Sequence, residues 1–133
     1  MPRQIGVPQP ISTQRDSLRR RVRRWYGHFN HEKWRECFEM VDPDLTLTGK
    51  VVQQHYLESL AQFKERYGNI QLWHVRISMH LREPKAVTNQ RPFAYVYVVW
   101  QDKRHNFHMF RERWVCQGSK WFTRVAGLVP GAA

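Results

Sequence analysis

Two polar residues in the last third of the chain have types and a setting that suit acid–base chemistry. Glu112 and His108 lie in the aromatic-rich stretch from Phe93 to Leu128, where one face of a strand is expected to be buried. A carboxyl group that is buried among aromatic rings has its charged form disfavoured by desolvation, and it can serve as a general acid or base. Glu112 and His108 are therefore the candidate catalytic residues.

These two residues are not expected to act as a hydrogen-bonded pair. They are four positions apart on one strand, which separates them by about 13 Å. Two plainer interpretations stay open: Glu112 pairs with an arginine, and His108 is a structural or exposed histidine.

The turns of this stretch predict how its side chains divide between two faces. Asp102 to His105 and Gln117 to Lys120 are turn-forming sequences between three strands, which indicates an antiparallel meander. Two-residue loops at Lys103–Arg104 and at Gly118–Ser119 would set the pairing of the strands. One face would then hold Phe93, Tyr95, Tyr97, Val99, His108, Phe110, Glu112, Trp114, Cys116, Trp121, Thr123 and Val125. The other would hold Ala94, Val96, Val98, Trp100, Phe107, Met109, Arg111, Arg113, Val115, Phe122, Arg124 and Ala126.

The first of these faces is expected to line a pocket. Glu112 would lie opposite Tyr95, and Tyr95 or Tyr97 would orient an oxygen atom of the ligand. The full set of expected ligand-binding residues is Tyr26, Tyr56, Tyr95, Tyr97, Trp114 and Thr123. Their aromatic character favours a small hydrophobic ligand.

The elements before this stretch are mostly helical. Residues 1–11 contain three prolines and are expected to form a flexible arm before a single domain of residues 12–133. A helix is predicted from Ser12 or Thr13, a second from Trp34 to Val41 and a third from Gln53 to Tyr67. A short strand is predicted at residues 45–48, and a longer one runs from Ile70 to Leu81. In the longer strand, the alternation predicts a buried face of Trp73, Val75, Ile77, Met79 and Leu81.

The chain is strongly basic, with 22 Lys and Arg against 11 Asp and Glu and a formal net charge of +11. Such a charge attracts nucleic acid, anionic lipid or an acidic protein. The first helix carries Arg20 and Arg24, and Arg111, Arg113 and Arg124 share the second sheet face with Trp100, Phe107 and Phe122. This mixture of arginine and aromatic residues is typical both of a surface for single-stranded nucleic acid and of a dimer interface. From these residues alone, both interpretations stay open.

The order of these elements resembles that of a known family. A helix, a short helix, Asp42-Pro43-Asp44-Leu45, a small strand, a further helix and long strands that end in FRERWVCQGSKWFTRVAGL are similar to the nuclear transport factor 2-like superfamily. This superfamily includes the SnoaL-like cyclases and the ketosteroid isomerases. The resemblance covers Leu18 to Leu128, and it implies an α+β cone in which helices pack into a strongly curved, mainly antiparallel sheet. It also implies a pocket and a homodimer formed through the sheet, but no single activity.

Several function classes find no support in the sequence. His28 and His31, and His105 and His108, do not form a convincing metal site, and no phosphate loop or dinucleotide fingerprint is present, so no metal and no cofactor are expected. No stretch has the length and apolarity of a membrane span. The two cysteines, Cys37 and Cys116, are expected to be reduced, which favours the cytoplasm.

Two functions follow. The first is binding of a small hydrophobic ligand, with proton-transfer chemistry of the isomerase, cyclase or dehydratase type. The second is a non-catalytic dimeric module whose basic helix and arginine-bearing sheet face dock RNA or an acidic protein.

Overall fold

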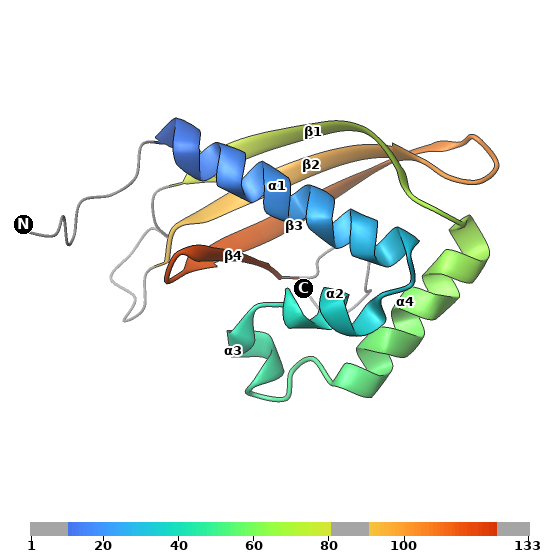
Figure 1. Cartoon of the computed structure of the whole chain (residues 1–133), viewed down its shortest axis with the longest axis horizontal. Coiled ribbons are helices and arrows are strands. Elements are labelled where there is room, and N and C mark those ends of the chain that lie inside the picture. Colours follow the sequence, from blue (N-terminus) through green and yellow to red (C-terminus); the bar gives the residue numbers. More distant parts are fainter. Residues whose placement is uncertain (1–10, 81–90, 125–133) are drawn as a thin grey trace, which may run out of the picture.

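The computed structural model describes residues 11–80 and 91–124, which form an α+β fold (Figure 1). Within them, the helices come first, and they are α1 (Ile11–Asn30), α2 (Trp34–Glu39), α3 (Pro43–Thr46) and α4 (Gln53–Tyr67). The strands follow, and they are β1 (Gln71–His80), β2 (Phe93–Gln101), β3 (Phe107–Gln117) and β4 (Lys120–Thr123). They pair in the order β1-β2-β3-β4 as one open antiparallel sheet. The predicted series of helices followed by a four-stranded antiparallel sheet is confirmed, apart from the short strand predicted at residues 45–48. Residues 1–10 of the expected arm and most of the loop before β2 lie outside the described residues.

Helix α1 packs its apolar stripe against the sheet, as its periodicity predicted. The buried positions of this stripe are Leu18, Val22, Trp25, Tyr26 and Phe29. The same helix is tied to both edges of the sheet. The Arg19 guanidinium donates a hydrogen bond to the carbonyl of Val75 in β1 at 2.6 Å, and that of Arg21 donates to the carbonyl of Trp121 in β4 at 3.1 Å.

The predicted strand at residues 45–48 is wrong, because this segment begins with the short helix α3. Asp42 caps that helix by accepting a hydrogen bond from the Asp44 backbone N–H at 3.1 Å, and Pro43 occupies its first turn. A capping aspartate followed by proline is a helix-start signal that outweighs the alternation of Leu and Thr after it. Leu45 is buried by the helix, whereas Leu47 is exposed.

Strand β1 follows its predicted alternation except at Trp73. Val75 and Ile77 are buried as expected, but Trp73 is 59% exposed. Leu72 pairs with Trp100 and His74 pairs with the next residue back, Val99, so Trp73 is an extra residue in the ladder. This β-bulge turns Trp73 away from the core, because a bulge places one additional side chain on the outer side of its strand.

The hairpin between β2 and β3 shows that the predicted division of side chains between the two faces of the sheet is wrong. Gln101 pairs with Phe107, so the loop has five residues instead of the expected two. Asp102 sets this loop: its carboxylate accepts hydrogen bonds from the backbone N–H groups of Arg104 and Asn106, and His105 adopts φ +67°. The longer loop shifts the pairing by one residue, which exchanges the two faces of β2. The predicted two-residue turn at Gly118–Ser119 is confirmed by the pairing of Gln117 with Lys120.

The sheet therefore has an inner face toward α1 and an outer face. The inner face carries Val75, Ile77, Ala94, Val96, Val98, Trp100, His108, Phe110, Glu112, Trp114, Trp121 and Thr123. The outer face carries His74, Arg76, Ser78, His80, Phe93, Tyr95, Tyr97, Val99, Phe107, Met109, Arg111, Arg113, Val115 and Phe122, with the bulged Trp73 at its end.

Candidate functional site

The inner face holds a buried carboxyl group at its centre. Glu112 lies opposite Val96 and is 4% exposed. One of its oxygens accepts a hydrogen bond from the Tyr26 hydroxyl at 2.5 Å, and the other accepts one from the Trp114 indole N–H at 3.1 Å. Among the described residues no arginine contacts this carboxyl group. Tyr26 and Trp114, which the sequence predicted as ligand-binding residues, are thus hydrogen-bond partners of Glu112.

Burial controls the ionisation of this cluster. Desolvation raises the pKa of Glu112 to about 7, although the hydrogen bonds from Tyr26 and Trp114 act in the opposite direction. Desolvation, together with the neighbouring Glu112 charge, raises the pKa of Tyr26 well above its ordinary value. Glu112 can therefore gain or lose a proton near neutral pH while Tyr26 stays a neutral donor.

Tyr56 brings a second hydroxyl group to the inner side from α4. It accepts a hydrogen bond from the Trp25 indole N–H at 3.3 Å, and no described residue accepts the proton of its own hydroxyl. Desolvation raises the pKa of Tyr56 well above its ordinary value. The hydroxyl groups of Tyr26 and Tyr56 are therefore hydrogen-bond donors in the same core as the Glu112 carboxyl group, which can titrate.

His108 belongs to a different local arrangement. Its Nε2 lies 2.8 Å from a carboxylate oxygen of Asp102, and its ring stacks on Trp100 with centroids 4.4 Å apart. The hydrogen bond with His108 holds the pKa of Asp102 down at about 2, although desolvation opposes it. His108 therefore interacts with Asp102 at the hairpin, whereas Glu112 interacts with Tyr26. The two residues do not form a hydrogen-bonded pair, as the strand spacing predicted.

Two of the expected pocket residues lie on the other face of the sheet. Tyr95 is opposite Arg113 and Tyr97 is opposite Arg111, so neither shares a face with Glu112. This corrects the predicted pairing of Glu112 with Tyr95, and the cause is the one-residue shift at the β2–β3 loop. Thr123 is on the inner face and is buried beside Trp114.

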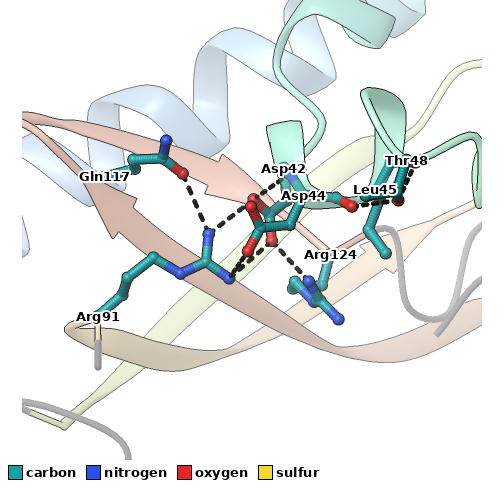
Figure 2. A network of polar contacts seen from close by, with 7 residues as sticks. All are labelled: Asp42, Asp44, Leu45, Thr48, Arg91, Gln117 and Arg124. Atoms are coloured by element: carbon teal, nitrogen blue, oxygen red, sulfur yellow. Dashed lines mark hydrogen bonds and ion pairs between the residues drawn. The ribbon is translucent and has the colours of Figure 1, made fainter. Parts of the chain in front are cut away.

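A network of ion pairs joins the start of α3 to the ends of β3 and β4 (Figure 2). The buried Asp42 carboxylate receives a two-point contact from Arg91, at 2.8 and 3.1 Å, and one from Arg124 at 2.6 Å. Arg91 also contacts Asp44 at 3.1 Å and Gln117 at 3.2 Å. Burial opposes ionisation of Asp42, but the hydrogen bonds from Arg91 and Arg124 outweigh it, so its pKa lies below the usual value. Arg124 therefore helps to neutralise Asp42, and its place in a basic interface stays a prediction.

An open groove of about 450 Å³ runs between α1 and the edge strand β1. Arg15, Arg19 and Arg23 line it from α1, where a spacing of four residues puts them on one side of the helix. The lining from β1 is Trp73, His74, Val75, Arg76 and Ile77. No carboxylate lines this groove among the residues that the structure describes, so these residues give it a positive electrostatic potential.

The outer face of the sheet continues this cationic surface. Three of its arginines lie over aromatic rings: Arg76 over Tyr97, Arg111 over Tyr95 and Arg113 over Phe93, at 4.4, 5.0 and 4.9 Å from the ring centroids. The only acidic residue within the described strands is Glu112, which points inward. Arginine and aromatic rings therefore alternate across this face, and none of the described strands adds a carboxylate to it.

The sequence pointed to other arginines of α1 than the groove uses. Arg20 and Arg24 are exposed but do not line the groove, whereas Arg15, Arg19 and Arg23 do. The four-residue spacing is visible in the sequence for both sets. Which set faces β1 depends on how α1 docks, and the bulge that exposes Trp73 has no sequence signal either.

The described residues hold no group of three or more His, Cys, Asp or Glu side chains placed to bind a metal ion. Cys37 and Cys116 form no disulfide, and burial raises the pKa of Cys37 to about 12. None of the described helices combines the length and the apolarity needed to cross a membrane.

No protein-family model matches this chain, and neither a curated protein nor a solved structure is similar to it. Function has to be argued from the residues themselves.

Proposed function

We propose that this protein is a non-catalytic binding module for a polyanion, which docks in the groove between α1 and β1. The observation that carries the proposal is the row of Arg15, Arg19 and Arg23 on α1 facing His74 and Arg76 on β1, with no carboxylate among the described lining residues. Like charges that converge on one groove repel one another and destabilise the free protein. A bound polyanion would offset this repulsion, which would explain why the cationic side chains gather in the groove.

The geometry of Arg19 adds to this argument. Its guanidinium donates to the Val75 carbonyl, so the charge is held at the floor of the groove. A guanidinium has five N–H donors. The hydrogen bond to Val75 uses one of them and leaves the others for an oxygen atom of the ligand. Arg15 and Arg23 flank it, one helical turn away on each side.

The homodimer through the sheet, which the sequence favoured, stays a prediction. A two-fold interface places the same patch on both sides, so the outer face would bring the patch that includes Arg76 and Arg111 against its own copy. None of the described strands supplies this face with a carboxylate to pair with those two charges. The charge pattern therefore supports a negatively charged ligand over a second copy.

The test is titration with inorganic polyphosphate at several salt concentrations. We expect the logarithm of the binding constant to fall linearly with the logarithm of the salt concentration, as for any ligand that releases counterions. The double variant Arg15→Glu/Arg23→Glu should lose most of the affinity, and the slope should fall by about two, one for each lost contact.

The matched control is Arg20→Glu/Arg24→Glu. It makes the same change of net charge on the same helix, at exposed positions outside the groove. We expect it to keep most of the affinity. An equal loss in both double variants would mean that net charge alone binds polyphosphate, and the groove proposal would be wrong.

We also propose, on the element order alone, that the chain is a distant member of the nuclear transport factor 2-like superfamily with a cone-shaped sheet. A cytoplasmic location stays a prediction.

A second candidate function is proton transfer on a small ligand at Glu112. It is supported by the short bond to Tyr26, by the pKa of Glu112 near 7 and by the unused hydroxyl proton of Tyr56. Its weakness is burial, because Glu112, Tyr26 and Trp114 are each at most 4% exposed and a substrate must reach the carboxyl group.

Native mass spectrometry of freshly purified protein tests this second candidate. A retained small molecule that is lost in Glu112→Gln would support it. Wild-type protein with no bound mass, and with no small-molecule binding in a thermal-shift screen, would leave the polyanion module as the only function proposed.

A further inference from the structure

Trp73 is in an unusual position for a tryptophan of this protein. All six tryptophans lie in the described part of the chain, and Trp73 alone is more than half exposed. The alternation of β1 would bury it, and the bulge between Leu72 and His74 is what turns it outward. Bulges commonly re-aim a side chain at a functional site, and an exposed indole gives up the stabilisation that burial supplies.

The exposed ring is also held in place. Its indole N–H donates to the Gln101 side chain at 3.2 Å, and its edge packs on Phe107 with centroids 5.2 Å apart. Phe107 is 55% exposed and Met109, two positions along β3, is 64% exposed. These residues form an apolar corner that is fixed by its own contacts and open to solvent.

This corner lies at the cationic groove. Trp73 itself lines the groove together with His74 and Arg76, and the arginines of α1 form the opposite wall. A ligand in the groove therefore meets guanidinium groups on one side and an aromatic face on the other. Sulfated sugars, polyphosphate and acidic peptides offer the charges but no flat aromatic groups, whereas a nucleic acid strand offers both.

We infer that the polyanion is single-stranded nucleic acid, with its phosphates along Arg15, Arg19 and Arg23 and a base stacked at Trp73 and Phe107. This inference rests on the proposed function. A duplex fits less well, because its bases are stacked inside the helix and present no free face to Trp73. The arginines of α1 recur about every 6 Å by helical rise, which suits an extended strand with one charge per nucleotide.

The experiment compares four ligands of similar total charge: a labelled oligothymidylate, a thymidylate–adenylate duplex of half its length, inorganic polyphosphate and polyglutamate. Trp73→Ala should weaken binding of the oligothymidylate by roughly 5- to 150-fold, the range for one base–aromatic stack, and leave polyphosphate unchanged. Trp73→Phe should restore most of the affinity because it keeps a ring. Leu47→Ala, at another exposed apolar residue that is not in the groove, should change neither.

The outcomes separate the two proposals. If polyphosphate and oligothymidylate bind equally well and Trp73→Ala affects neither, the polyanion module stands and the inference about single strands is wrong. Tighter binding of the duplex or of polyglutamate would overturn the inference in favour of those partners. If no polyanion binds, or if the double variant Arg15→Glu/Arg23→Glu binds with unchanged affinity, both proposals are wrong.

Discussion

The two faces of the sheet differ in the partners that their charged side chains have. On the inner face, both oxygens of Glu112 are hydrogen-bonded by Tyr26 and Trp114, so its polar atoms are satisfied within the chain. On the outer face, Arg76 and Arg111 lie over tyrosine rings and no strand supplies a carboxylate. A cation–π contact positions a guanidinium but does not neutralise it. The inner carboxyl group has its hydrogen-bond partners within the chain, whereas the outer face and its groove carry the cationic groups that the proposed external anion would neutralise.

The largest expected effect is the difference in the free energy of unfolding between variants that lack a tryptophan on one face or on the other. Trp114→Ala removes a fully buried side chain and a donor to Glu112, and we expect it to lower the free energy of unfolding by about 3–5 kcal/mol. Trp73→Ala should lower it by less than about 1 kcal/mol, because the side chain is mostly exposed. Urea denaturation of both variants measures the difference. Equal losses would mean that Trp73 is part of the core, and the contrast between the faces would disappear.

The next largest effect concerns the inner carboxyl group and pH. The folded-state pKa of Glu112 is raised from 4.5 to about 7, so its contribution to stability is present below the unfolded-state pKa and is lost as pH rises through 7. At 1.36 kcal/mol for each pKa unit, the loss between about pH 4 and pH 8 is at most about 3 kcal/mol. Glu112→Gln should remove this loss. Unfolding at several pH values checks it, with the exposed Glu39→Gln as the control that should keep the wild-type profile.

The smallest expected effect concerns the loop that separates the faces. The folded-state pKa of Asp102 is depressed to about 2, so its contribution is present above the unfolded-state value near 4 and is lost as pH falls from about 4 to about 2. Asp102→Asn keeps an oxygen for the loop N–H groups but loses the charge beside His108. The variant should be slightly less stable than wild type at pH 5, and the difference should vanish near pH 2. A difference that persists at pH 2 would show that Asp102 acts through the loop geometry instead of its charge.

The candidate site was predictable in part. Glu112 stood out as a carboxyl residue within an aromatic strand, and Tyr26, Tyr56 and Trp114 were expected on the inner side because their helical and strand positions are apolar. Tyr95 and Tyr97 were misplaced by the loop at Asp102. The groove was missed because Arg15, Arg19 and Arg23 have the same four-residue spacing as Arg20 and Arg24, and only the docking of α1 distinguishes the two sets.

The sequence by itself determined the class of the fold, the placement of the helices before the four strands, and the apolar stripe of α1. These follow from local periodicity, in which each residue's partners lie within a few positions along the chain. The tertiary structure decided the pairing of β2 with β3, the outward turn of Trp73 and the side of α1 that faces β1. Each depends on a shift of one residue or on the rotation of a helix about its axis. With a period of two, a shift of one residue moves every side chain of a strand to the other face.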